Sequence, residues 1–234
     1  MKKLGIIGAM QVEVQTLREK MQDVTLVQRA GMEFCEGVLE GLPAVVVQCG
    51  VGKVNAAICA QILCDCFAVT HLINTGIAGS LCADLDIGDF VISRDAMYHD
   101  FTCHAINPAY CVGQVPGLDV LRFPADETLV HYAFAASEKV NSAHAKIGTI
   151  ASGDQFVASA EQKKQIICDT GALCTEMEGA AVAHTAWRNG VPFVIIRAIS
   201  DKADNSAQMD YPTFEAIAAQ RCAEVILCLA NRIA

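Results

Sequence analysis

The sequence predicts an α/β fold, a single-domain three-layer α/β/α sandwich with helices on both faces of a central sheet. Short apolar runs typical of strands alternate with longer helix-like segments along the chain. These runs are apolar throughout, as expected for strands that are buried on both faces of a sheet. The 234 residues contain no internal repeat or low-complexity linker, so we expect one domain covering residues 1–234.

Glycines mark the ends of the expected strands in the first half of the chain. The run PAVVVQC at 43–49 is continuously apolar and is followed by Gly50. Leu17 and Met21 lie four residues apart, which places them on one face of a helix. The predicted elements are strands at 5–10, 43–49, 71–75 and 89–93 and helices at 13–21 and 53–67.

An irregular stretch at 101–122 separates the two halves of the chain. It contains Pro108, Gly113, Pro116 and Gly117, and it predicts a long loop of the kind that is often functional in a compact domain. Beyond it, the pattern predicts strands at 146–151 and 192–198 and helices at 126–140, near Glu161, at 176–187 and at 211–232.

The charge balance excludes some partners. The chain carries 26 acidic and 17 basic residues, so nucleic acid and anionic membrane surfaces are not expected to bind it. Two lysines precede the first apolar run, but that run is short and Glu13 follows it, so it predicts a buried strand instead of a signal peptide. No apolar stretch reaches the length of a membrane span. We therefore expect a cytoplasmic protein.

Twelve cysteines are present without a CxxC pair, and six histidines are scattered without an HExxH motif. In a long chain without an export signal, this pattern favours reduced, structural thiols over disulfides or a zinc site. We expect no metal and no cofactor.

Glycines and acids gather just after the predicted strands, where ligands bind in an open α/β sheet. Each acid alone has a simpler interpretation, because Glu13 suits a helix N-terminus and Asp201 suits an N-cap. Glu176 and Glu178 lie two residues apart and cannot share one helix face. The glycine turn GVGK lacks the spacing of a P-loop. The combination points to a pocket for a polar, hydroxyl-rich molecule.

Seven motifs stand in order along the chain: GIIGAM..E at 5–13, G.GK.NAA at 50–57, NTG.AG at 74–79, YHD at 98–100, SGD.F at 152–156, EMEG.A.A at 176–183 and RAISD.AD at 197–204. Together they resemble the bacterial 5'-methylthioadenosine/S-adenosylhomocysteine nucleosidases of the nucleoside phosphorylase/hydrolase superfamily. The resemblance runs from Gly5 through the last helix, and it implies a nucleoside phosphorylase-like sandwich with a mixed, twisted central sheet.

The resemblance implies a role for each acid. Glu13 matches the acid that activates water, and Asp201 matches the acid that protonates N7 of the departing adenine. Glu178, with Met177, matches the group that holds the ribose hydroxyls. Opposed acid and base also suit an oxocarbenium-like transition state and predict inversion at the anomeric carbon.

Further residues match the walls of the family's binding site. Phe156 matches the ring that stacks on adenine, and the backbone of Val157 matches the group that reads the base edge. Gly79 and Val51 match pocket-lining positions, and Ser200 and Arg197 match the shell that orients the acid Asp201. Met10 and Tyr211 are expected near the 5' substituent, and Ile77 stands where the family often has serine.

The implied activity is hydrolysis of the N-glycosidic bond of 5'-methylthioadenosine, S-adenosylhomocysteine and 5'-deoxyadenosine, which serves methionine salvage. A homodimer is implied as well, in which Cys103, Ile106 and Pro116 of one chain cover the 5' pocket of its partner. The alternatives are a purine nucleoside phosphorylase, an aminofutalosine nucleosidase and a non-catalytic nucleoside sensor. Lys53 stands near the glycine turns without an arginine, which favours water over phosphate.

Overall fold

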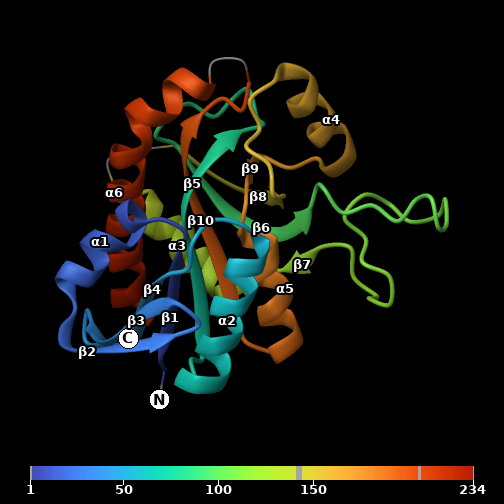
Figure 1. The fold of residues 1–234 in the computed structure, drawn as a ribbon. Coiled ribbons are helices and arrows are strands. Elements are labelled where there is room, and N and C mark those ends of the chain that lie inside the picture. Colours follow the sequence, from blue (N-terminus) through green and yellow to red (C-terminus); the bar gives the residue numbers. More distant parts are fainter. Residues whose placement is uncertain (1, 141–143, 205–206, 234) are drawn as a thin grey trace.

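The computed structural model describes residues 2–140, 144–204 and 207–233 and confirms the predicted fold class, a mixed α/β sheet flanked by helices (Figure 1). The strands are β1 (Leu4–Gly8), β2 (Gln22–Arg29), β3 (Met32–Leu39), β4 (Leu42–Gln48), β5 (His71–Ser80), β6 (Phe90–Tyr98), β7 (Phe123–Pro124), β8 (Ala145–Ser152), β9 (Cys174–Glu176) and β10 (Phe193–Asp201). The helices are α1 (Gln11–Lys20), α2 (Lys53–Phe67), α3 (Glu127–Ser137), α4 (Ala160–Thr170), α5 (Gly179–Asn189) and α6 (Ala207–Ile233).

Part of the sheet closes on itself. The sheet order is β10-β6-β8-β9-β5-β1-β4-β3-β2, and β10 also pairs with β5, so that five strands form a ring. Within this ring β6, β8 and β9 run opposite to β5 and β10. The carboxyl ends of β5, β8 and β10 nevertheless approach one another, because the end of β5 pairs with β9 and the end of β8 lies beside Glu176.

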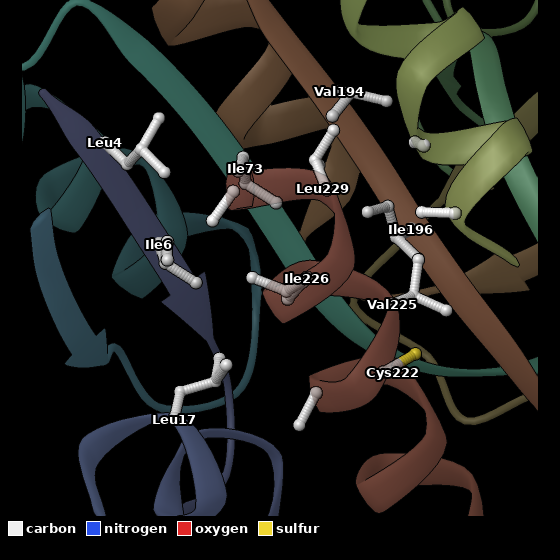
Figure 2. Packing of buried hydrophobic residues seen from close by; sticks show 14 of the residues in the cluster. Leu4, Ile6, Leu17, Ile73, Val194, Ile196, Cys222, Val225, Ile226 and Leu229 are labelled. Atoms are coloured by element: carbon white, nitrogen blue, oxygen red, sulfur yellow. The ribbon is translucent and has the colours of Figure 1, made fainter. Parts of the chain in front are cut away.

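The core lies on both faces of the sheet. On one face, α6 packs against β1, β5 and β10 through Cys222, Val225, Ile226 and Leu229 (Figure 2). Their spacing of three and four residues forms one helix face. Burying each of the three aliphatic side chains, Val225, Ile226 and Leu229, stabilises the fold by about 1.5–3 kcal/mol. On the other face, α2 and α5 cover the sheet with a second apolar cluster.

Several elements differ from the sequence prediction. The hairpin β2–β3 is not predicted, because β2 is exposed along almost its whole length and lacks an apolar run. The short strands β7 and β9 are not predicted either. Helix α5 begins at Gly179 and not at residue 176, so Glu176 ends a strand and Glu178 precedes the helix.

Three further features bear on the expected partners and groups. All twelve cysteines lie in the described residues and are free thiols, and Cys59 and Cys222 are buried. Within residues 2–140, 144–204 and 207–233, no helix is both long and apolar enough to cross a membrane. In the same ranges, no group of three or more histidine, cysteine or acidic residues is arranged to hold a metal ion.

Candidate active site

A cavity lies where the ends of β5, β8, β9 and β10 meet the start of α1. It encloses about 600 Å³ of space, including the part that is open to solvent. Its walls are formed by Ala9, Met10, Glu13, Val51, Ile77, Ala78, Gly79, Gln155, Phe156, Val157, Thr175, Glu176, Met177, Glu178, Ser200, Asp201 and Tyr211.

Glu13 lies in the first turn of α1 and is almost fully buried. Its Oε2 accepts hydrogen bonds from the amides of Ala9 (2.7 Å) and Met10 (3.0 Å), and Oε1 accepts one from the amide of Ile77 (3.2 Å). Burial raises the pKa of this carboxyl above its ordinary value, while nearby Arg197 and the three amides act in the opposite direction. The result is an oriented carboxyl group with a raised proton affinity.

Asp201 ends β10 and is also buried. Its Oδ2 accepts a hydrogen bond from the hydroxyl of Ser200 (2.9 Å), and Oδ1 accepts one from the amide of Ala203 (2.8 Å). Gly79 on β5 pairs with Asp201, and a Cβ at Gly79 would stand 2.8 Å from Asp201 Oδ1. The absence of a side chain at Gly79 therefore keeps room for this carboxylate at the cavity wall.

Glu13 and Asp201 both contact the same short stretch of β5. Glu13 accepts its bond from Ile77, and Asp201 pairs with Gly79 two residues further along. Successive residues advance by about 3.3 Å along a strand, so a small molecule seated against this stretch can reach both acids.

Glu178 forms a third carboxylate in the cavity wall. Its Oε1 accepts a 2.7 Å hydrogen bond from the amide of Gly52, and its side chain does not cap α5. The pKa of Glu178 is raised to about 8, chiefly by burial and then by the charge of Glu176, while Arg197 lowers it.

Glu176 has a different environment from Glu178. Its carboxylate accepts hydrogen bonds from the Ser152 hydroxyl and the amides of Glu178 and Gly179, and it forms a buried ion pair with Arg197. Glu176 therefore caps α5 and binds the arginine, which leaves Glu178 directed to the cavity.

Arg197 stands behind the cavity and does not line it. It donates to Asn74 Oδ1 (2.6 Å) and to Glu176, although the sequence resemblance implied a role in orienting Asp201. A side chain at Gly76 would collide with both Arg197 and Glu13. An arginine thus does approach the NTGIAG motif, which lies within β5 and does not form a turn, but this arginine is buried and paired with a carboxylate.

An aromatic pair borders the open side of the cavity. Phe156 is about half exposed, and its ring meets that of Tyr211 edge-on with 5.5 Å between the centroids. The Tyr211 hydroxyl lies 3.3 Å from the sulfur of Met10. Val157 is buried in the wall beside them. An apolar, planar group can lie against the Phe156 ring.

Three of the expected binding residues lie elsewhere. Cys103, Ile106 and Pro116 belong to the loop between β6 and β7, which extends away from the body of the molecule (Figure 1). None of them lines the cavity of its own chain. Conversely, five residues line the cavity without having been predicted as site residues: Ala9, Ala78, Gln155, Thr175 and Glu176. Each lies one or two positions from a predicted residue, which is the signal that could have found them.

Lys53 is engaged away from the cavity. Its ammonium contacts both carboxylate oxygens of Asp100 at 2.6 and 2.7 Å, and it lies 3.7 Å from Asp154. No lysine or arginine lines the cavity among the described residues. The wall instead presents four acidic residues, which suits a neutral, hydroxyl-rich ligand better than a phosphate.

Comparison with known proteins agrees with this geometry. Residues 3–230 match the family model of the phosphorylase superfamily. The 5'-methylthioadenosine/S-adenosylhomocysteine nucleosidase of Geobacillus thermodenitrificans is 42% identical over 97% of this chain and 95% of its own. The structure of the Neisseria meningitidis nucleosidase of the same name, in complex with methylthio-immucillin-A, matches with a TM-score of 0.94 and 38% identity, covering 99% of this chain and 100% of that one. The futalosine hydrolase of Helicobacter pylori matches with a TM-score of 0.93 and 31% identity, covering 99% of this chain and 98% of that one.

Proposed function

The chain belongs to the phosphorylase superfamily, in the family of the 5'-methylthioadenosine/S-adenosylhomocysteine nucleosidases, and from this premise we propose how its cavity carries out the reaction. It is an N-glycosyl hydrolase that cleaves the bond between ribose and adenine in 5'-methylthioadenosine and S-adenosylhomocysteine. The mechanism rests on one observation: buried Glu13 and buried Asp201 line a single cavity and contact the same stretch of β5.

Asp201 is the proton donor in this proposal. Adenine leaves poorly as an anion, so its ring nitrogen N7 must receive a proton as the glycosidic bond breaks. The Ser200 hydroxyl and the Ala203 amide hold the Asp201 carboxyl at the cavity wall. A protonated Asp201 can donate its proton to N7, which leaves a carboxylate, and this carboxylate takes up a proton from solvent after adenine leaves.

Glu13 is the proton acceptor. Water must attack the anomeric carbon from the face opposite the departing base, and a base must take its proton. Three backbone amides fix the Glu13 carboxylate, so its orientation is set before substrate binds. The two acids then act from opposite sides of the sugar, and the configuration at the anomeric carbon inverts.

Glu178 holds the ribose and stabilises its developing charge. The pKa of Glu178 is raised to about 8 in the ligand-free protein, and the positive charge that forms on the ribose in the transition state favours its ionised form, which in turn lowers the energy of that charge. Glu178 is buried and anchored by the Gly52 amide, and Met177 lies beside it in the wall. Phe156 stacks on adenine at the open side, while the Val157 backbone faces the base edge.

A second copy of the chain completes the site in this proposal. Val54 and Ile58 are exposed and share one face of the first turns of α2, and exposed Val51 lies just before this helix in the cavity wall. Ile106, on the extended loop, is 79% exposed. We propose a homodimer in which the loop at 101–122 of one protomer covers the α2 face of its partner and closes the 5' end of the pocket with Cys103, Ile106 and Pro116.

We also propose a cytoplasmic location and a role in methionine salvage. Twelve free thiols are typical of a reducing compartment. The 5'-substituted ribose that the reaction releases retains the sulfur-bearing group, which further reactions can recover.

A substrate panel tests the proposed function. 5'-Methylthioadenosine, S-adenosylhomocysteine, 5'-deoxyadenosine, adenosine, inosine and aminofutalosine are incubated with enzyme, with and without inorganic phosphate, and free base is quantified. We expect adenine from the first three substrates at a rate independent of phosphate. Formation of ribose 1-phosphate would identify a phosphorylase, and preferred cleavage of aminofutalosine would assign the chain to the activity named for the Helicobacter pylori relative.

A further inference from the structure

Three sequence motifs meet beside the cavity, and each contains a charged side chain that the mechanism does not use. They are the turn Gly50–Lys53, the triplet Tyr98-His99-Asp100 and the turn Ser152-Gly153-Asp154. The Lys53 ammonium lies against both oxygens of Asp100 at 2.6 and 2.7 Å and within 3.7 Å of Asp154. These three side chains join segments that are 47 and 101 residues apart in sequence.

Backbone hydrogen bonds close the cluster. Asp100 Oδ2 accepts a 2.8 Å bond from the amide of Asp154, and Asp154 Oδ1 accepts a 2.8 Å bond from the amide of Lys53. Burial alone would raise the pKa of Asp100, but the bonds from Lys53 and from the Asp154 amide leave this pKa lowered. Asp100 is therefore a carboxylate at neutral pH, and it accepts hydrogen bonds from both the Lys53 ammonium and the Asp154 amide.

The glycines of these turns allow the close approach. Gly52 has φ of +99°, a conformation that disfavours a side chain, and a Cβ there would stand 3.1 Å from Asp154 Oδ1. A Cβ at Gly153 would collide with the ring of His99. The three segments are thus packed too tightly to accept larger residues at these points.

The cluster connects the two halves of the ligand site. The Gly52 amide donates to Glu178, while the next amide in the chain, that of Lys53, donates to Asp154. Asp154 lies two residues before Phe156 and three before Val157. One turn of backbone therefore anchors both the ribose-binding glutamate and the segment that carries the adenine-binding residues.

We propose that Asp100, Lys53 and Asp154 form a positioning clamp that sets the distance between Glu178 and the Phe156–Val157 segment. None of the three lines the cavity, so they act through the residues that do. The inference rests on the proposed function, since it requires Glu178 and Phe156 to hold the two ends of one nucleoside.

The test is the substitution Asp100→Asn, which keeps the size of the side chain and removes its charge. With 5'-methylthioadenosine as substrate, we expect KM to rise about tenfold while kcat stays within about twofold, because misplaced binding groups weaken ground state and transition state alike. Lys53→Arg, which retains the charge, should keep most of the affinity. A merely structural role would lower the melting temperature and leave KM unchanged.

A double-mutant cycle gives the decisive measurement. If the clamp positions Glu178, the effects of Asp100→Asn and Glu178→Gln on kcat/KM should not be independent. The fold-loss in kcat/KM of the double variant should then be smaller, by about threefold or more, than the product of the two single fold-losses. The matched control is Asp84→Asn, which breaks the exposed ion pair with Lys146 and should be multiplicative with Glu178→Gln.

Each outcome decides between the hypotheses. Wild-type enzyme that releases no adenine would overturn the proposed function, whereas active wild type with multiplicative losses in the cycle would overturn only the clamp. If Asp100→Asn does not fold, Lys53→Gln removes the same ion pair from the other side and replaces it in the cycle.

Discussion

The backbone amide of Glu178 donates a 3.0 Å hydrogen bond to the side chain of Glu176, and the two glutamates thereby take different places in the site. Glu176 is bound to Arg197 and to the start of α5, so its charge is compensated within the protein. Glu178 keeps one anchoring bond, from Gly52, and faces the cavity. This difference makes the protonation of Glu178 sensitive to both pH and ligand.

The raised pKa of Glu178 predicts a pH-dependent stability. Its pKa is about 8 in the folded protein, against an ordinary value of 4.5. Between pH 4.5 and pH 8, Glu178 holds a proton in the folded chain that it has lost in the unfolded chain. The stabilising contribution of this proton to the free energy of unfolding is therefore full below pH 4.5 and is lost as the pH rises through 8. Glu178→Gln should remove this dependence. Wild type should lose about 4 kcal/mol of its free energy of unfolding between pH 5 and pH 8.5 through this group, and the variant should not.

Urea unfolding of the ligand-free enzyme across this pH range measures the effect. Glu161→Gln, at an exposed position in the first turn of α4, is the control and should follow wild type. Parallel curves for wild type and Glu178→Gln would show that Glu178 titrates normally in the folded state.

The ion pair of Glu176 with Arg197 predicts a large loss of stability when it is broken. Glu176→Gln leaves the buried guanidinium without its closest anion, and breaking a buried pair typically costs about 3–5 kcal/mol. The control is Glu36→Gln, which breaks a partly exposed pair with Lys3 and should cost at most about 1 kcal/mol. Denaturant unfolding measures the free energy of unfolding of both variants. Similar losses of this free energy in the two variants would contradict a structural role for the buried pair.

The contrast between these glutamates also shows where sequence reasoning ends. Spacing excluded a shared helix face for Glu176 and Glu178, but it could not tell which one faces the ligand. That choice depends on Arg197, 21 residues away, whose side chain is oriented by the closed ring of strands. The clamp of Asp100, Lys53 and Asp154 is non-local in the same way.

Secondary structure shows the same limit. Continuous apolar runs predicted β4 and β10, because strands buried on both faces must be apolar on both. Strand β2 is held by pairing with β3 and not by burial, so its composition carries no such pattern. The positions of Glu13 and Asp201 were predicted because they follow strands closely, and their shared contact with β5 required the structure.

Removal of the proposed proton donor should stop catalysis and spare binding. Asp201→Asn keeps the shape of the side chain but cannot supply the proton to adenine, so kcat should fall by about 10²- to 10⁴-fold. Binding of a non-hydrolysable nucleoside analogue, measured by calorimetry, should be retained within about tenfold. Asp169→Asn, at an exposed position on α4, should be fully active. Normal turnover by Asp201→Asn would refute the assigned role.

The assignment of Glu13 as the base predicts how kcat/KM falls at acidic pH. Burial raises the pKa of Glu13 above 4.5, and a base works only when ionised, so kcat/KM should fall with decreasing pH through a midpoint above 4.5. Glu13→Gln should lower kcat by about 10²- to 10⁴-fold, while Glu19→Gln, on the exposed side of the same helix, should change nothing. An acidic limb centred at or below 4.5 would mean that another group governs the profile.

The exposed loop between β6 and β7 predicts that assembly and activity are linked. If Ile106 of one protomer covers the pocket of its partner, Ile106→Asp should place a charge in an apolar interface and weaken the dimer. Sedimentation velocity should then show monomer at concentrations where wild type is dimeric, with KM for 5'-methylthioadenosine raised and activity recovering as protein concentration rises. Ile167→Asp, at an exposed isoleucine on α4 away from the loop, is the matched control and should remain dimeric. Wild type that is active and monomeric at all concentrations would refute the shared pocket, because each chain would then close its own 5' site.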